Sequence, residues 1–389
     1  MPNKSVDVSL AVEVSPLWEL QYTGISNVVH EICKRLLREN GIKITYTVMG
    51  RRIPKTLIET CVSEKSGAAL QAAFSTHSLP ALEVEENGYV DGKPTVGLFT
   101  NTKPPHKVFS IDTQIYYDFS PLLTPECHTA DTVKHHMAGI TEQIRTCERL
   151  FCISESTAKD LEWIFDVPRS KIRVSLLGNN VDFDFSRTAR RAIGKREVEP
   201  FFLILGTIEP RKNISIVLKW LHQHPEVASS YRFVFAGREG WGPSFLELAR
   251  IEQVQHLFDQ QRIIHLGYVD EWSKATLLVG AHALIFPSVF EGFGLPILES
   301  MAVGTLVMSS CATSLPEVLG DCGYYFDPQS PESLHRAFLA LSGDVEIGYA
   351  GQMRKKAVDR AATFSYDQTY ETIMVSLREQ FNSLESFAT

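Results

Sequence analysis

Short apolar runs alternate with longer helical patterns along almost the whole chain, and this alternation constrains the fold more than any other feature. Runs at residues 201–206, 232–236 and 283–287 are rich in aromatic, β-branched and other apolar residues, as is typical of strands buried on both faces. Residues 25–37 instead repeat apolar side chains at three- and four-residue spacing, which predicts an amphipathic helix. Strands that alternate with helices form parallel sheets covered by helices. The expected fold class is therefore α/β, with doubly wound sheets.

The pattern also divides the chain into two halves of similar size. Its 389 residues exceed what one hydrophobic core usually serves, and the alternation begins again at residue 201. Residues 177–182 read as a Gly/Asn turn, and residues 186–199 are polar and basic, as is typical of a linker. We therefore predict an N-terminal domain at residues 1–178 and a C-terminal domain at residues 179–364. Ligands would bind in a crevice between the carboxyl ends of the two sheets.

Composition and missing motifs exclude several classes of protein. The formal net charge is −8 and no long basic run occurs, so nucleic acid is not an expected partner. The seven cysteines include no C-x-x-C pair, which predicts neither a disulfide framework nor a zinc site and fits a reducing cytoplasm. The first residues lack the apolar core of a signal peptide, and the longest uncharged apolar stretch, 275–290, is too short to span a bilayer. No phosphate-binding motif of the NAD or P-loop type is present.

The most informative segment, FEGFGLPILESMA, covers residues 290–302. A predicted strand runs into a glycine-punctuated turn, and Pro296 suits an early helical position. Backbone amides at such a helix start can approach and bind a phosphate. Glu291 precedes the turn and Glu299 follows in the helix, so one carboxylate can face the sugar of a nucleotide sugar and the other its ribose. The alternative is an ordinary strand–turn–helix with a capping glutamate.

Two further segments follow predicted strands of the same half. In GTIEPRKN, residues 206–213, adjacent Arg211 and Lys212 can bind a diphosphate and stabilise its growing charge as the bond to sugar breaks. The alternative is a solvated pair of surface cations. In residues 236–242, the glycines permit backbone contact with a base, and Trp241 could wall that pocket. An ordinary loop with a packed tryptophan explains the same residues.

These segments resemble one known family. Residues 265–328 and the GTIEPRKN segment together look like the retaining glycosyltransferases of the GT4 type, which have the GT-B fold of two facing Rossmann-like domains. The pair of Glu291 and Glu299 matches the E-x7-E motif of that family. The resemblance also implies that a closing helix at about residues 365–389 packs back on the N-terminal, acceptor-binding domain.

The resemblance implies specific roles. Glu291 would lie beside the donor sugar, and Glu299 would bind the ribose. Arg211 and Lys212 would hold the diphosphate, so no metal and no other cofactor is expected. Asp118 would lie by the reacting sugar, with Tyr117 standing where many relatives have histidine. Backbone amides of Gly292, Phe293, Gly294 and Leu295 would contact the donor phosphate and sugar, and Gly24 would lie near the donor phosphates or the acceptor. Beside these, the glycine loops of the second half are expected to bind the donor at Gly206, Gly237 and Arg238.

The expected activity is retaining transfer of a hexose from a nucleotide sugar, with GDP-mannose as the first choice, to a glycan or lipid-linked glycan in surface-polysaccharide synthesis. Two alternatives stay open: a sugar-nucleotide epimerase or glycan phosphorylase of related fold, and a catalytically silent module that binds nucleotide sugar. The expected location is the cytoplasm. The basic flank of the first helix fits either a solvated face or peripheral contact with the inner face of the cytoplasmic membrane.

Overall fold

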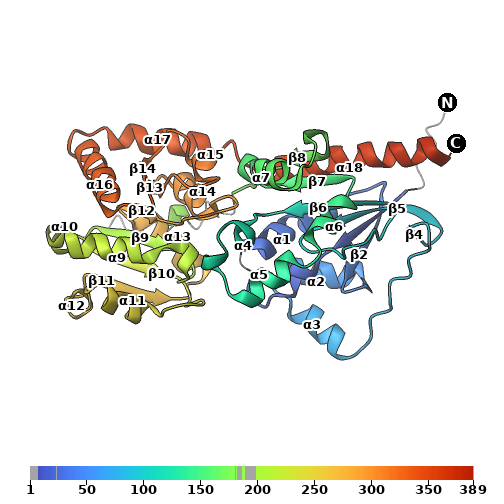
Figure 1. Cartoon of the computed structure of the whole chain (residues 1–389), viewed down its shortest axis with the longest axis horizontal. Coiled ribbons are helices and arrows are strands. Elements are labelled where there is room, and N and C mark those ends of the chain that lie inside the picture. Colours follow the sequence, from blue (N-terminus) through green and yellow to red (C-terminus); the bar gives the residue numbers. More distant parts are fainter. Residues whose placement is uncertain (1–7, 23, 180, 182–185, 189–198, 389) are drawn as a thin grey trace. The chain divides into compact units, whose positions relative to one another are not determined.

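The computed structural model describes residues 8–22, 24–179, 181, 186–188 and 199–388, and most of the predicted linker falls outside these ranges. The chain forms two compact units (Figure 1). Unit 1 contains Met1–Asp118, His136–Gly178 and Tyr366–Thr389, and unit 2 contains Phe119–His135 and Asn179–Ser365. Residues 119–135 lie within the range predicted for the first domain but group with unit 2.

Unit 2 is built on a six-stranded parallel sheet whose order is β11-β10-β9-β12-β13-β14. The central strands β9 and β12 are fully buried, as their apolar sequences predict. Strand order reverses between β9 and β12, and open α/β sheets bind ligands outside the carboxyl ends of the strands at such a reversal. The strands are β9 Phe201–Leu205, β10 Arg232–Ala236, β11 Ile263–Gly267, β12 Ala283–Phe286, β13 Leu306–Ser310 and β14 Tyr324–Phe326.

Local sequence explains where several helices of unit 2 begin. Ser244 accepts from the backbone N–H of Glu247 while the Glu247 side chain accepts from Ser244, which is a capping box. The Asp270 carboxylate caps helix α13 by accepting from the backbone N–H of Ser273. The α-helices of unit 2 are α4 Ser120–Leu123, α9 Ile214–Gln223, α10 Pro225–Ser230, α11 Phe245–Ile251, α12 His256–Asp259, α13 Glu271–Gly280, α14 Leu295–Ala302, α15 Leu315–Leu319, α16 Pro331–Glu346 and α17 Ala350–Ala361. Helix α5, Ala130–Met137, straddles the division between the units.

Unit 1 contains a larger sheet with the order β3-β2-β1-β5-β6-β7-β8, in which β3 and the off-path strand β4 run antiparallel to their neighbours. Here the order reverses between β1 and β5. The expected α/β class with doubly wound sheets is therefore confirmed. The strands are β1 Ser9–Glu13, β2 Lys43–Val48, β3 Arg51–Ile53, β4 Tyr89–Val90, β5 Lys93–Phe99, β6 Ile111–Tyr116, β7 Arg149–Cys152 and β8 Ile172–Val174.

The helices of unit 1 include the amphipathic helix expected near the N-terminus and the last helix of the chain. Helix α1 buries Val28, Val29 and Ile32 on one face. Helix α18 lies against β8: the Ser175 hydroxyl donates to the Thr369 carbonyl at 3.0 Å, and the Thr369 hydroxyl donates to the carbonyl of Leu176. The helices are α1 Gly24–Leu36, α2 Lys55–Glu64, α3 Ala68–Ser75, α6 Ile140–Arg145, α7 Glu155–Phe165 and α18 Tyr366–Ala388.

Glu13, the last residue of β1, has an unusual environment for a carboxyl group. Its Oε1 atom accepts from the backbone N–H of Ser15 at 2.9 Å, while Oε2 is enclosed and has no hydrogen-bond partner among the residues that the structure describes. Burial raises the pKa of Glu13 from 4.5 to about 7, an effect that the hydrogen bonds of Ser15 only partly offset. The folded protein therefore retains a proton near pH 6 that the unfolded chain has released.

This proton makes stability depend on pH. Because the folded-state pKa is raised, the free energy of unfolding should fall as pH rises from 4.5 to about 7, by about 3 kcal/mol in total from this group. Glu13→Gln cannot ionise, so it should lose this part of the dependence. Denaturant midpoints measured at pH 4, 6 and 8 for both proteins test the prediction. Parallel pH curves for the two proteins would contradict it.

Candidate functional site

The candidate site lies where the strand order of unit 2 reverses. The loop after β9 forms a short 3-10 turn at Pro210–Lys212, and the loop after β12 carries Glu291 into helix α14. Because β9 and β12 are neighbours in the sheet, these two loops meet at its carboxyl edge. The backbone N–H of Val289 donates to the Arg211 carbonyl at 2.9 Å, which joins the loops directly.

Three predicted site residues come together there as an ion cluster. The Glu291 carboxylate accepts from the Arg211 guanidinium through Oε2 at 2.9 Å and from the Lys212 ammonium through Oε1 at 2.5 Å. Arg211 also donates to the Phe290 carbonyl and to the Glu209 carboxylate, each at 2.9 Å. Burial alone would raise the pKa of Glu291, but the charges of Lys212 and Arg211 outweigh it and hold the pKa at about 2. Glu291 is therefore anionic at neutral pH.

The backbone of Glu291 is held as firmly as its side chain. Its N–H donates to the Thr313 hydroxyl oxygen at 2.9 Å, and its carbonyl accepts from the Thr313 and Ser314 hydroxyls at 2.7 and 2.8 Å. Thr313 itself has a left-handed φ of +45°. Such bonds fix the carboxylate before any ligand arrives, which favours precise placement of a binding group.

The turn after Glu291 leads into helix α14, as the sequence predicts. Gly294 precedes α14 with a φ of +103°, and an added Cβ would lie 2.7 Å from the Leu315 side chain. A residue with a side chain would therefore be strained there. Gly292 and Phe293 are buried beside it, and Leu295 opens the helix. The first N–H groups of a helix have no partner within it, so this turn can present amides to an anion.

Glu299 is not part of the ion cluster. It lies one turn into α14, where its carboxylate accepts from the Lys274 ammonium at 2.8 Å. Burial would lower the pKa of Lys274, but Glu299 and Glu271 raise it above its ordinary value. Sequence reasoning missed Lys274, because Glu271 and Lys274 show the spacing of a solvated helix pair. The two glutamates of the motif thus have separate cations.

The glycine loops after β9 and β10 touch each other. Gly206 has a φ of +147°, and a Cβ on Gly237 would lie 1.9 Å from the Gly206 carbonyl oxygen. Only glycine at position 237 permits that approach. Arg238 is exposed, and its carbonyl accepts from the N–H of Ile208 at 2.9 Å. These residues therefore line the same carboxyl edge of the sheet as the ion cluster.

The remaining predicted residues belong to unit 1. Gly24 opens α1, and Asp118 follows β6. The Tyr117 hydroxyl donates to the Thr100 carbonyl at 2.9 Å, so its side chain is occupied inside the unit. Sequence reasoning missed Asp160 on α7, whose pKa is raised to about 6 by burial and by the nearby charge of Asp118. No motif in the sequence around Asp160 marks it as a site residue.

One group among the described residues has the spacing of metal ligands, and it lies outside the ion cluster. His224, Glu226 and His335 each offer an atom within 4.8 Å of the others. The two imidazoles, however, stack at 3.6 Å and 5°, and Trp220 donates to Nδ1 of His335. Lone pairs in two parallel stacked rings cannot converge on one ion, so this arrangement does not fit a metal site.

The chain is similar in sequence to known glycosyltransferases. Residues 185–361 match the family model described as glycosyl transferases group 1. The chain is 30% identical over 229 residues to O-antigen chain mannosyltransferase B of Escherichia coli, which covers 58% of this chain and 59% of that protein. It is 27% identical over 263 residues to the serotype-specific mannosyltransferase WbdA of Escherichia coli, covering 66% of this chain and 32% of WbdA. The chain thus spans between a third and three fifths of these relatives' lengths.

Solved structures show the fold. Sucrose-phosphate synthase from Thermosynechococcus elongatus superposes with a TM-score of 0.68 at 16% identity, covering 96% of this chain and 99% of that one. WaaG, a glycosyltransferase involved in lipopolysaccharide biosynthesis, gives a TM-score of 0.62 at 14% identity, covering 94% and 98%. The architecture is therefore that of the GT-B fold, as the sequence resemblance implied.

Proposed function

We propose that this chain, whose residues 185–361 belong to the glycosyl transferases group 1 family, is a retaining hexosyltransferase that uses a nucleotide-sugar donor. The observation that carries the proposal is the cluster of Glu291, Arg211 and Lys212 at the strand-order reversal of unit 2. Two cations at a sheet edge can bind a diphosphate and stabilise it as a leaving group. They would take the place of a metal ion.

The ion cluster also supports transfer with retention of the anomeric configuration. Both carboxylate oxygens of Glu291 are bound by cations, which makes this carboxylate a poor nucleophile. The sugar would then receive the acceptor hydroxyl on the face that the diphosphate leaves, and the leaving phosphate oxygen would take the hydroxyl proton. Glu291 would orient the sugar, Glu299 would bind the ribose, and Asp118 of unit 1 would lie by the reacting sugar.

The names of the relatives support the choice of substrates. O-antigen chain mannosyltransferase B and WbdA are both named as mannosyltransferases, so GDP-mannose is the proposed donor and a glycan or lipid-linked glycan the proposed acceptor. In the described part of the chain, no helix is long and apolar enough to cross a bilayer. We place the reaction in the cytoplasm, with peripheral contact at the membrane that carries the acceptor.

Thermal unfolding with a panel of GDP-, UDP-, dTDP- and ADP-sugars tests the donor site. A ligand at one hundred times its Kd stabilises the folded state by about 2.7 kcal/mol. GDP-mannose should raise the Tm by a few degrees, and the other nucleotides should raise it less. The stabilising donor is then tested for transfer to a mannose-terminated acceptor. Donor turnover without acceptor would indicate an epimerase, and binding without turnover would indicate a silent module.

A further inference from the structure

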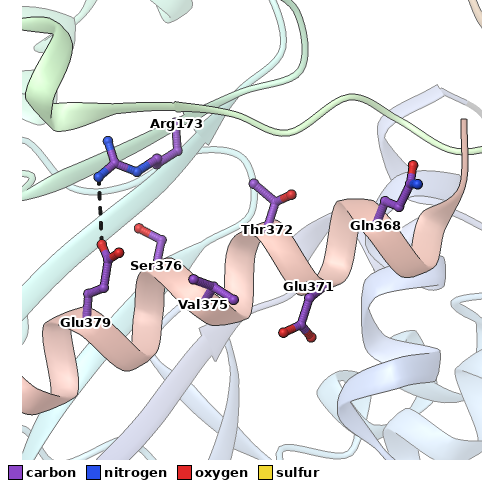
Figure 2. A pocket seen from close by; sticks show the side chains of 7 residues that line it. All are labelled: Arg173, Gln368, Glu371, Thr372, Val375, Ser376 and Glu379. Carbon is purple, nitrogen blue, oxygen red and sulfur yellow. Dashed lines mark ion pairs between the residues drawn. The ribbon is translucent and has the colours of Figure 1, made fainter.

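Lys274 of α13 and Glu299 of α14 form an ion pair that is shielded from solvent. The ammonium group and the carboxylate Oε1 atom are 2.8 Å apart, and the two side chains are 20% and 7% exposed. Arg173 and Glu379 of unit 1 show the ordinary case: they pair at 3.7 Å beside β8 and α18, with 38% and 49% of their side chains exposed (Figure 2). Exposed pairs contribute little to stability, whereas the pair in unit 2 takes two charges out of water.

Both positions of the shielded pair would suit apolar side chains. Glu299 stands in a run of buried residues of α14, Ile297–Ala302. Lys274 precedes Ala275 and lies one turn before Leu278, and these are the buried residues of α13. Apolar residues of similar size are often as stable as a buried ion pair, because the charges lose their hydration. Stability of the fold therefore does not explain the two charges, which favours a role in ligand binding.

The two oxygen atoms of the Glu299 carboxylate differ in their surroundings. Oε1 accepts from Lys274, whose ammonium also lies 3.2 Å from the Glu271 carboxylate. Oε2 accepts from no residue in the described part of the chain, and it is not one of the enclosed oxygen atoms. One oxygen is thus fixed by a cation, and the other stays open to a hydroxyl group, which can donate to a carboxylate.

The place of Glu299 in α14 suits a ribose that follows a bound phosphate. The backbone amides at the start of α14 are the expected phosphate contacts, and Glu299 comes four residues after Leu295, about 6 Å along the helix axis. Its side chain leans toward that helix start, because Cα–Cβ bonds tilt toward the N-terminus of a helix. A ribose joined to the phosphate would therefore bring its hydroxyl groups toward Oε2.

We propose that Lys274 is a positioning residue that makes the nucleotide site selective for ribose: it holds Oε1 of Glu299, so that Oε2 accepts from the 2′- and 3′-hydroxyl groups. This inference rests on the proposed function, in which Glu299 binds the ribose. Without Lys274, the carboxylate would turn toward water, because an unpaired buried charge is costly, and Oε2 would leave the ribose. Donors that lack the 2′-hydroxyl group, such as dTDP-sugars, should bind more weakly than ribose donors.

Lys274→Met tests this role with three ligands that differ only in the ribose: GDP, 2′-deoxy-GDP and 3′-deoxy-GDP. Methionine keeps an unbranched side chain and removes the charge, whereas Lys274→Arg retains a cation. Lys219→Met is the matched control, because it removes a lysine charge from an exposed position on α9. Each protein is titrated by calorimetry, with the same three forms of UDP in parallel. The Kd values are compared within one protein, so a partly unfolded sample cannot imitate the effect.

The wild type and Lys219→Met should bind the ribonucleotide about tenfold more tightly than either deoxy form, as expected for a hydrogen bond to a charged group. Lys274→Met should bind the three forms within about twofold of one another, and Lys274→Arg should keep most of the preference. In transfer assays, Lys274→Met should raise KM for GDP-mannose about tenfold and leave kcat within about twofold, because the ribose contact is the same before and during transfer.

A preference for ribose that persists in Lys274→Met would overturn the role of Lys274, and so would a fall in kcat at unchanged KM. Equal binding of the three forms by the wild type would overturn it as well, because Glu299 would then not recognise the ribose. In these cases the wild type still binds nucleotide, so the proposed function stands. A wild type that binds neither GDP nor UDP would overturn the proposed function, and this inference with it.

Discussion

Replacing Glu291 by glutamine should abolish sugar transfer and, at the same time, tighten the binding of free nucleoside diphosphate. Both oxygens of the Glu291 carboxylate are occupied by Arg211 and Lys212, the cations proposed to hold the diphosphate. With a pKa of about 2, Glu291 remains charged at any working pH. An incoming diphosphate must therefore compete with this carboxylate for the same two cations.

Glutamine keeps the size of the side chain but removes that competition. Turnover should fall by at least about a hundredfold, as expected when a group that acts on the transition state is lost. The Kd for GDP should fall by about tenfold, which corresponds to about 1.4 kcal/mol. Steady-state kinetics with GDP-mannose and calorimetry with GDP measure the two effects separately.

Glu299→Gln is the matched control for this experiment. Glu299 is bound by Lys274 and not by the two cations of the cluster, so its loss should weaken nucleotide binding and never tighten it. Near-normal turnover of Glu291→Gln would refute the assignment of Glu291. Unchanged or weaker GDP binding would show that Arg211 and Lys212 do not hold the diphosphate.

Replacing Lys212 by methionine should cost both stability and activity. The substitution leaves the buried Glu291 carboxylate with Arg211 as its remaining partner in the cluster, and removing one partner of a buried ion pair typically costs about 3 kcal/mol or more. Because Arg211 still compensates part of the charge, we expect a loss of about 2 kcal/mol in the free energy of unfolding. Transfer should fall by about a hundredfold, since a charge that stabilises the leaving group is gone.

A double variant separates the two effects. Lys212→Met combined with Glu291→Gln removes the uncompensated charge, so its stability should exceed that expected from the sum of the single losses, while transfer stays absent. Denaturant unfolding of the four proteins gives the coupling free energy directly. A coupling near zero would mean that the 2.5 Å contact between Lys212 and Glu291 contributes nothing to the folded state.

The ion pairs of Arg211 and Lys212 with Glu291 separate what the local sequence can predict from what it cannot. The place of Arg211 and Lys212 after a predicted strand puts them at the carboxyl edge of the sheet, and the structure confirms that position. Their role as diphosphate ligands stays a prediction. Their ion pairs with Glu291 were not predicted. Arg211 and Lys212 are 80 and 79 residues away from Glu291 in the sequence. A periodic pattern predicts strands and helices, but it does not predict which of their loops lie next to each other.

Lys274 and Asp160 illustrate the same limit. Glu271 and Lys274 look like a solvated pair on a helix, yet the structure puts the Lys274 ammonium against Glu299, a residue from another helix. Asp160 looks like any polar residue on a helix until β6 is known to end beside α7. The ion pair of Lys274 and the raised pKa of Asp160 each depend on a residue that lies far away in the sequence. The local sequence therefore cannot predict either property.

The sequence by itself determined the elements and the motifs of this protein. Strand and helix periodicity, helix caps and the glycine turn at Gly294 are local properties, since each depends on a few consecutive residues and their backbone preferences. Only the tertiary structure decided the order of the strands, and that order places β9 beside β12 and hence Arg211 and Lys212 against Glu291. It also decided which charges are buried, because the pKa of Glu13 or Glu291 is set by the atoms packed around it and not by its sequence neighbours.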